Sequence, residues 1–574
     1  PSAETLGAVD VIATDKTGTL TKNEMTVTDI YLDERHFSVS GSGYAPTGAL
    51  FINGEATTER EAKLKELLLA GYLANDTTLT QVDDTWTING EPTDGAFLTA
   101  YHKLMPNKES VQLEKLDLLP FDSFHRYMAS LVQFSNGAKK IYLKGAPDKL
   151  FNFAQQQDPT FKRSFWQAKA DHLANQGKRV VALGVIKDAD QITELEHKHL
   201  ETGFTFLGLT GIIDPPRPEV IAALREMNKA KVEVKMITGD APLTAAAIGQ
   251  QLGLADGELH TITGVEWDQL TAEQKQKAAV KHQIFARTTP ENKLEIIEAL
   301  QQSGKVTAMT GDGVNDAPAL KKADIGVSMG IKGTDAAKEA SDMILTDDNF
   351  ATLATAIKEG RRIYDNIKKS ILFLLPTSFA EGLIIFLTIL FNQEMPLQAT
   401  QLLWINLVSA ITIQFAFIFE PGARDLMKRP PRKSNSRLIS GREMLQLGYV
   451  SLLIALVGLG AYEMLIATGA SATLASTAMV NIIVFSKIFY LFNIRTEESA
   501  FSSASFTNKK AFSIILLMIL LQMGLTYLPF MQEAFSTTGM QLGEWILTIV
   551  CGFSVLAVTE LDKYLKFRLA RARN

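Results

Sequence analysis

The chain of 574 residues has a single cysteine, Cys551, so it cannot form an internal disulfide bond. Such a composition fits a protein whose bulk faces a reducing compartment such as the cytoplasm. Acidic side chains barely outnumber basic ones, 63 against 57, and the net charge of −6 argues against nucleic acid as a partner. No basic segment followed by an apolar run stands behind Pro1, so we find no secretory signal peptide.

The sequence also lacks the motif GxxxxGK[ST], which excludes a nucleotide site of the P-loop type. The glycine-rich stretch GSGYAPTG at 41–48 matches neither that motif nor GxGxxG. Any nucleotide must therefore be bound in another way.

Up to about residue 360 the sequence is typical of an α/β protein. Short runs rich in Val and Ile alternate with helical patterns rich in Ala, Glu, Lys and Leu. Several apolar runs end on a Gly/Asp cluster: FLGLTGIID (206–214), KVEVKMITGD (231–240) and KVTAMTGDGVND (305–316). In a doubly wound parallel sheet such strand ends gather along one edge, where ligands bind.

Beyond residue 365 the composition changes, and six apolar stretches are each long enough to cross a membrane, which takes ~20 residues. They lie near 370–391, 398–420, 444–468, 474–493, 511–530 and 542–560. Three connecting loops contain no Lys or Arg, whereas the loop 422–443 carries a cluster of them. The positive-inside rule then predicts an integral membrane protein with both termini and the α/β half in the cytoplasm, and we expect the plasma membrane.

A carboxylate ends the first apolar run, in VDVIATDKTGTLTKNE (9–24). Asp15 at a strand end suits a nucleophile, and Thr17 and Gly18 supply backbone groups that can approach a phosphoryl oxygen. In TGDGVNDAP (310–318), Asp312 and Asp316 lie four residues apart around a turn and offer the hard oxygen ligands that Mg²⁺ prefers.

Two further features are weaker evidence for a phosphate site when each is taken alone. Thr238-Gly239-Asp240 is a second turn of this kind, but T-G-D is also an ordinary turn sequence. Lys293, in ARTTPENKLE, would clamp the charge of a transferring phosphoryl group, although an isolated lysine on a helix is more often merely solvated.

The blocks DKTGTLT (15–21), TGD (238–240) and TGDGVNDAP (310–318), in this order, resemble the P-type ATPases of the calcium and sodium/potassium pump branch. Between them the same family is matched by GEPTDGAFL (90–98), PFDSFHRYMAS (120–130), KGAPD (144–148), GKRVVA (177–182) and DPPRPEV (214–220). The resemblance covers essentially the whole chain. It implies a haloacid-dehalogenase-like Rossmann phosphorylation domain in two parts (1–26 and 214–355), an inserted α+β nucleotide-binding domain (27–213) and a transmembrane domain of six helices (356–574).

The resemblance also implies the chemistry, with ATP and Mg²⁺ as cofactors. Asp15 would take the γ-phosphoryl group of ATP as an aspartyl phosphate, and Mg²⁺ would be held by Asp15, the Thr17 carbonyl and Asp312. The other residues carried over to the phosphate and the loops around it are Lys16, Asp214, Thr238, Gly239, Asp240, Arg287, Lys293, Asn315 and Asp316. Those carried over to the nucleotide are Asp94, Phe121 (stacked on adenine), Lys144, Gly145 and Arg179.

Some positions depart from the family pattern. PTD stands where the family often has PTE, KGAPD stands for KGAPE, and His125-Arg126 replaces a more basic pair, which predicts weaker nucleotide affinity. Related phosphatases commonly carry an acidic residue two positions after the nucleophile. Here Thr17 has that place and cannot do acid/base work at neutral pH, so the phosphoenzyme is expected to persist, as suits a pump.

Ionisable groups inside membrane spans are functional candidates, because each costs ~3 kcal/mol on insertion scales. Glu381 lies mid-span, shortly after Pro376, and with Asn406 and Ser409 it matches cation ligands of this branch of pumps. The alternative role for these residues is interhelical hydrogen bonding. For Glu381 the sequence favours a role as cation ligand, and for Ser409 it supports the two roles equally.

Two departures bear on the ion. Ala410 stands where calcium pumps that move two ions carry an acidic residue, and Lys487 lies mid-span. Lys487 is expected to pair with Glu381 or Glu463, either as a structural salt bridge or in place of a counter-transported cation. One Ca²⁺, or a monovalent ion such as Na⁺ or H⁺, fits this charge better than two divalent ions.

The actuator domain of the family, with its TGE loop, and the first four spans are not found in this sequence. We therefore expect the C-terminal part of a pump, either a shortened chain or one half of a split protein whose N-terminal half is a separate partner. Alone it is not expected to complete a transport cycle.

Two other functions compete with the cation pump. A membrane-anchored phosphohydrolase of the dehalogenase superfamily would share Asp15, Asp312 and Asp316 but leaves Glu381 unexplained. A non-transporting subunit that only binds nucleotide would have no need of an intact DKTGT.

Overall fold

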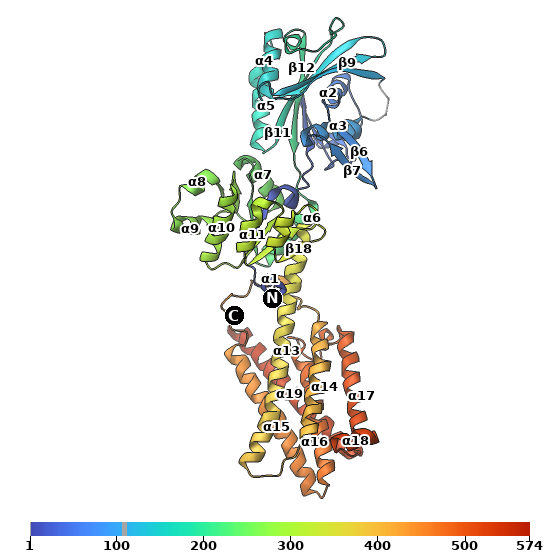
Figure 1. The fold of residues 1–574 in the computed structure, drawn as a ribbon, viewed down its shortest axis with the longest axis vertical. Helices are drawn as coiled ribbons and strands as arrows, with labels where there is room; N and C mark the ends of the chain where they lie inside the picture. Colours follow the sequence, from blue (N-terminus) through green and yellow to red (C-terminus); the bar gives the residue numbers. More distant parts are fainter. Residues whose placement is uncertain (1, 106–111, 574) are drawn as a thin grey trace. The chain divides into compact units, whose positions relative to one another are not determined.

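The computed structural model describes residues 2–105 and 112–573 (Figure 1). The chain divides into two compact units. One is Val9–Ala354, and the other combines Pro1–Ala8 with Thr355–Asn574.

The unit Val9–Ala354 contains a parallel sheet of seven strands in the order β14-β15-β13-β1-β16-β17-β18. In that order the strands are Thr261–Thr263, Ile284–Ala286, Glu233–Ile237, Val11–Asp15, Thr307–Gly311, Ile325–Met329 and Met343–Leu345. The helices between them are α6 (Pro218–Lys229), α7 (Pro242–Leu252), α8 (Gly264–Asp268), α9 (Ala272–Lys281), α10 (Pro290–Gln302), α11 (Ala317–Lys322) and α12 (Asp335–Ala340). Since Asp15 pairs in register with Ile237 of β13, the chemistry-bearing turns follow neighbouring strand ends, as the sequence predicts.

Between β1 and β13 the chain forms a second, antiparallel sheet of nine strands in the order β5-β4-β3-β2-β12-β11-β10-β9-β8. In that order the strands are Glu55–Thr57, Leu50–Ile52, Arg35–Val39, Thr26–Leu32, Phe204–Ile213, Arg179–Ile186, Lys139–Gly145, Tyr127–Phe134 and Leu113–Leu119. The pair β6-β7 (Thr78–Val82, Thr85–Asn89) forms a separate hairpin.

Helices lie on both faces of the antiparallel sheet (Figure 1). Alternate residues of a strand point to opposite faces and pack against different helices. Leu183 joins the core under α2 (Ala62–Leu73) and α3 (Pro92–Leu104), while its neighbour Ala182 faces α4 (Pro147–Gln157) and α5 (Arg163–Asn175). Both strand faces are therefore buried, which explains the continuous apolar run of β11.

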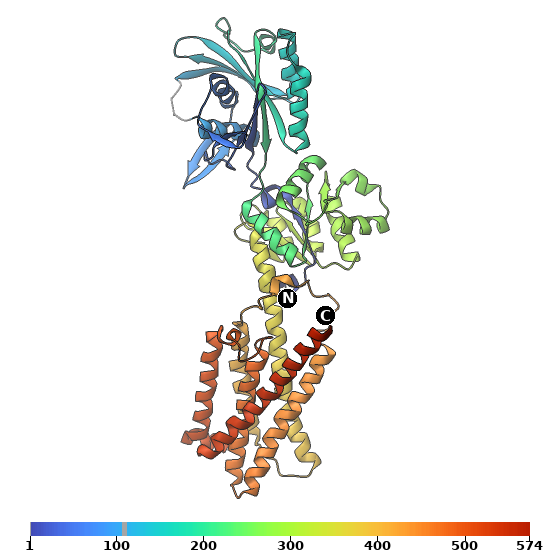
Figure 2. The same ribbon diagram turned by 180° about the vertical axis from the view of Figure 1, so that it is seen from behind.

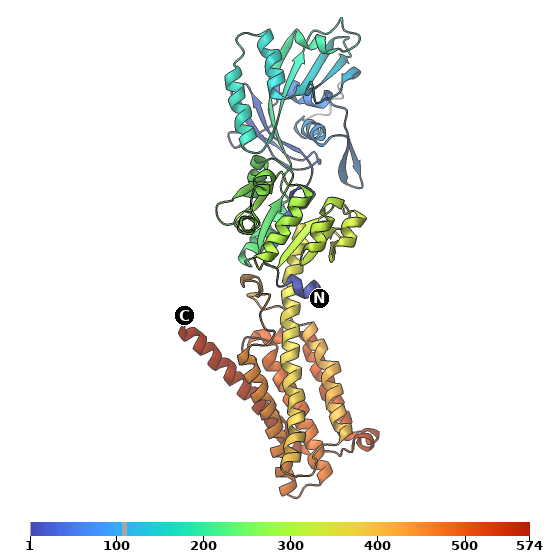
Figure 3. The ribbon, with the colours of Figure 1, turned by 60° about the vertical axis from the view of Figure 1, so that its left-hand side comes forward.

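The other unit is a helix bundle. Within the described part of the chain, six helices are long and apolar enough to cross a membrane, as the sequence predicts. They are α13 (Phe350–Leu390), α14 (Ala399–Ile418), α15 (Gly441–Ala467), α16 (Ala472–Ile494), α17 (Lys509–Tyr527) and α19 (Leu542–Arg573), and the short helices are α1 (Ser2–Leu6) and α18 (Pro529–Phe535). Helix α16 is the most buried and packs against α14, α15, α17 and α19. Helix α19 runs obliquely along the bundle (Figures 2 and 3).

Helices α13 and α19 extend well beyond the predicted apolar stretches. Helix α13 begins at Phe350, twenty residues before the predicted span, and α19 continues to Arg573. In both helices a charged segment continues the apolar one without a break. Hydropathy therefore marks where the helix becomes apolar, but it does not mark where the helix begins or ends.

Candidate functional site

The end of β1 holds a cluster of charged groups contributed by three separate parts of the chain. Lys293 of α10 lies between two carboxylates, with Nζ 2.9 Å from Oδ1 of Asp15 and 2.8 Å from Oδ1 of Asp316. The carboxylates of Asp15, Asp312 and Asp316 offer oxygen atoms that all lie within 4.8 Å of one another. The structure thus brings together the four residues that the sequence singled out from three motifs.

Asp316 is fully engaged within the protein. Besides Lys293, it accepts hydrogen bonds at Oδ2 from the backbone N–H groups of Asp312 and Gly313, at 3.2 and 3.1 Å. It therefore fixes the lysine and the loop, and oxygen atoms of Asp15 and Asp312 remain for a ligand.

Burial and crowding perturb this cluster. Burial raises the pKa of Asp15 to about 7; Lys293 opposes this shift, and the neighbouring carboxylates Asp316 and Asp312 add to it. Burial, followed by the charge of Asp316, also raises the pKa of Asp312. Carboxylates that repel one another at one spot gain most from a bound cation, so these side chains fit Mg²⁺.

The turn after Asp15 is shaped by its glycine and by a buried lysine. Gly18 has φ of +76°, a conformation that favours glycine. The Lys16 side chain is buried and forms ion pairs with Asp240, at 2.6 Å, and Asp214, at 3.8 Å. Lys16 and Asp240 are thus engaged in an ion pair with each other. Thr17, in contrast, is exposed at the turn.

Arg217 also supports this turn, and the sequence reasoning did not single it out. Its guanidinium donates hydrogen bonds to the backbone carbonyls of Gly18, at 3.1 Å, and Thr21, at 3.0 Å. Asp214 accepts from the Thr21 hydroxyl at 2.5 Å. The available signal for Arg217 was its place within DPPRPEV, three residues after Asp214.

The remaining phosphate candidates border the cluster in different ways. The Thr238 hydroxyl accepts a hydrogen bond from the Asp240 backbone N–H at 3.1 Å. A side chain at Gly239 would meet open space, which leaves room for a ligand there. Arg287, with φ of +52°, and Asn315 are exposed.

The five nucleotide candidates line one cavity of about 670 Å³ beside the antiparallel sheet. They are Asp94, Phe121, Lys144, Gly145 and Arg179. Lys144 is buried and lies 2.6 Å from Asp94, and burial lowers its pKa to about 8 although Asp94 opposes the shift. Phe121 is 58% exposed, an unusual state for a phenylalanine and one that suits stacking on a flat ring.

Inside the helix bundle, Glu381 of α13 and Lys487 of α16 form a buried ion pair of 2.8 Å. Lys487 also donates to the Ser409 hydroxyl of α14, at 3.1 Å. Of the two predicted partners of Lys487 the structure selects Glu381, because Glu463 is exposed. Asn406 is exposed on α14 and is not brought to this pair.

Pro376 has a clear effect on the same helix. It lacks the N–H that would bond to the Leu372 carbonyl one turn earlier. The Tyr490 hydroxyl donates to that carbonyl instead, at 3.1 Å, and so joins α16 to α13.

The chain joins a strand-end aspartate, held by a lysine, to six helices of membrane length among the residues that the structure describes. That combination of a mixed α/β part and a transmembrane bundle is the architecture of the P-type ATPases. Two family models agree: "P-type ATPase, cytoplasmic domain N" matches residues 63–219, and "Cation transporting ATPase, C-terminus" matches 394–565.

Curated relatives place the chain within that class. It is 37% identical over 573 residues to "Cation-transporting ATPase pma1" of Synechocystis sp., covering 96% of this chain and 63% of the relative. It is 37% identical over 566 residues to "Calcium-transporting ATPase" of Bacillus subtilis, with the same coverage, and 36% identical over 581 residues to "Calcium-transporting ATPase 1" of Saccharomyces cerevisiae, covering 98% and 61%. The chain belongs to the P-type cation-transporting ATPases and spans just under two thirds of the length of these relatives.

Proposed function

We propose that this protein works in an ATP-driven cation pump whose phosphorylated residue is Asp15. The observation that carries the proposal is the lysine clamp, in which Lys293 holds Asp15 and Asp316 at 2.9 and 2.8 Å. The relatives' names, which specify cation or calcium transport, support the same activity.

In the proposed reaction a carboxylate oxygen of Asp15 attacks the γ-phosphorus of ATP, the bond to the bridging oxygen breaks, and ADP leaves. Lys293 neutralises charge on the transferring group. Mg²⁺ held by Asp15, the Thr17 carbonyl and Asp312 would supply further positive charge to the phosphate oxygens. Because Thr17 offers no acid or base, water does not readily release the phosphate.

We place the nucleotide in the cavity lined by Phe121 and Lys144. The exposed ring of Phe121 would stack on adenine, and the Lys144 ammonium, with three donors and Asp94 as one acceptor, would have donors left for the ligand. Arg179, which donates to the Thr93 hydroxyl at 2.6 Å, is held at the rim by that bond.

For the transported ion we propose a site around Glu381 and Ser409. The ion pair with Lys487 leaves little negative charge there, which favours one Ca²⁺ or a monovalent ion such as Na⁺ or H⁺ over two divalent ions. Asn406 would contribute only after a rearrangement of α14, because its side chain is exposed. We expect the basic loop 422–443 on the cytoplasmic side of the plasma membrane.

The test is transfer of ³²P from [γ-³²P]ATP, trapped in acid, across a panel of cations. We expect a hydroxylamine-labile label that depends on one cation and is lost in Asp15→Asn. Label that turns over rapidly without any cation dependence would instead indicate a phosphohydrolase, and a lack of label under every cation would contradict the proposal.

A further inference from the structure

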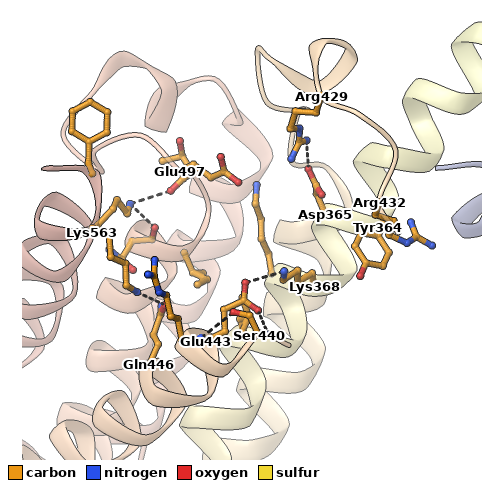
Figure 4. Close-up of a pocket in the computed structure, with 18 of the residues that line it drawn as sticks. Tyr364, Asp365, Lys368, Arg429, Arg432, Ser440, Glu443, Gln446, Glu497 and Lys563 are labelled. Carbon is orange, nitrogen blue, oxygen red and sulfur yellow. Dashed lines mark hydrogen bonds and ion pairs between the residues drawn. The ribbon is translucent and has the colours of Figure 1, made fainter. Parts of the chain in front are cut away.

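A cavity of about 740 Å³ lies at the basic end of the helix bundle (Figure 4). Its walls come from α13, the loop before α15, the first turns of α15, the end of α16 and the last turns of α19. All of its lining belongs to the unit formed by Pro1–Ala8 and Thr355–Asn574. Neither the Asp15 cluster nor the Glu381 pair contributes to it, so the proposed pump reaction gives it no role.

The lining carries an excess of positive charge, with eight Lys and Arg side chains against four Asp and Glu. Three of these carboxylates are already held by lining cations: Lys368 to Glu443 at 2.8 Å, Arg429 to Asp365 at 2.8 Å, and Lys566 to Asp562 at 2.7 Å. The first two pairs are visible in Figure 4. Glu497 is the fourth lining carboxylate, and the other five lining cations are Arg361, Lys369, Arg432, Arg442 and Lys563. Two of these five pair with carboxylates outside the lining: Lys563 with Glu560 at 3.0 Å and Arg432 with Glu4 at 3.6 Å.

Three of these five cations serve the protein's own backbone. Lys369 donates to the Arg495 carbonyl, and Lys563 to the Asn493 carbonyl, each at 2.8 Å, so both satisfy the end of α16. Arg361 donates to two carbonyls of the loop before α15. Their positions are explained without a ligand.

Arg432 and Arg442 keep guanidinium N–H groups without a partner among the described residues. Arg432 stacks on the Tyr364 ring, with 3.7 Å from Cζ to the ring centre. Its Nη2 donates to the Glu4 carbonyl at 3.2 Å and lies 3.6 Å from the Glu4 carboxylate. In the part of the chain that the structure describes, its Nε and Nη1 groups make no hydrogen bond or ion pair. Among the residues that the structure describes, the Arg442 side chain makes no hydrogen bond or ion pair, and it is exposed.

We propose that this cavity binds the phosphate headgroup of an anionic phospholipid through Arg432 and Arg442. A guanidinium matches phosphate with parallel hydrogen bonds, and basic pockets between membrane helices are a setting for such headgroups. The depth fits as well, because Lys368 and Lys369 directly precede the apolar stretch of α13. The apolar side chains of Leu372, Ile494 and Phe567 also line the cavity, and the glycerol and upper acyl chain would lie against them.

The test uses the purified protein in mild detergent, titrated with dioctanoyl phosphatidic acid, dioctanoyl phosphatidylcholine or inorganic phosphate, with binding read by native mass spectrometry. One cation near an anionic lipid is worth roughly a fivefold change in binding. We therefore expect phosphatidic acid to bind Arg442→Gln about fivefold more weakly and the double variant Arg432→Gln/Arg442→Gln about 25-fold more weakly than the unchanged protein.

Arg437→Gln is the matched control, because Arg437 is exposed on the same loop but does not line the cavity. It should change binding of phosphatidic acid by less than about twofold. An equal loss in Arg437→Gln would indicate general attraction to a basic surface and overturn the proposal, as would unchanged binding in Arg442→Gln. Inorganic phosphate that binds as tightly as phosphatidic acid would identify a site for the free ion and overturn the assignment to lipid.

Discussion

Lys293 touches two carboxylates at once, and its removal should leave the reaction without its charge clamp. We expect Lys293→Met to lower the rate of phosphoenzyme formation by about 100-fold, the cost of losing one electrostatic stabiliser of a transition state. The measurement is acid-trapped ³²P label in rapid-quench experiments. Lys281→Met, at an exposed lysine of the same unit, is the control and should label normally.

Lys144 predicts how ATP affinity depends on pH. Burial lowers its pKa to about 8, so the ammonium is present at pH 7 and largely lost at pH 9. In the proposed nucleotide site the Lys144 cation binds ATP, so affinity for a fluorescent ATP analogue should be about tenfold lower at pH 9 than at pH 7.

Unfolding at high pH cannot explain this loss of ATP affinity, because the lowered pKa of Lys144 stabilises the folded state as the pH rises. The unfolded chain keeps the Lys144 proton up to pH near 10.5, so this group makes the folded state relatively more stable as the pH rises past 8. In Lys144→Gln the affinity should be low at both pH values, and an unchanged tenfold decrease in this variant would assign the pH effect to another group.

The ion pair of Glu381 and Lys487 joins α13 to α16. We expect the effects of substitutions at these two residues on stability to be non-additive. Lys487→Met leaves the buried Glu381 carboxylate without its partner, which costs about 3–5 kcal/mol. The double variant Glu381→Gln/Lys487→Met removes both charges and should regain most of that stability while losing cation-dependent phosphorylation. Thermal unfolding in detergent measures the first effect, and strictly additive melting shifts would show that the pair is not coupled.

The elements could largely be predicted, because six apolar stretches of membrane length and several strand ends with Gly/Asp turns leave few other arrangements. The contacts between side chains could not. Lys16 directly follows Asp15, yet its buried ammonium pairs with Asp240 and Asp214, because a buried cation needs carboxylate partners. Asn406 and Ser409 share a helix face by spacing, but the border between buried and exposed residues falls between them.

At the scale of the whole molecule, the single cysteine permits a direct test of orientation. In a Cys551→Ala background, Ser434→Cys on the basic loop and Glu394→Cys on the opposite loop each give one exposed thiol. We expect a membrane-impermeant maleimide to label only Glu394→Cys in intact cells and both variants after permeabilisation. The opposite pattern would reverse the orientation that the positive-inside rule predicts.

The buried pair of Glu381 and Lys487 has an electrical consequence. With both groups ionised the pair carries no net charge, so a site built around it is neutral before any ion enters. An arriving cation adds its whole charge, and moving one charge through 100 mV involves about 2.3 kcal/mol. In the proposed cycle the membrane voltage therefore acts on the loaded protein, while the return of the empty site proceeds at a rate independent of voltage.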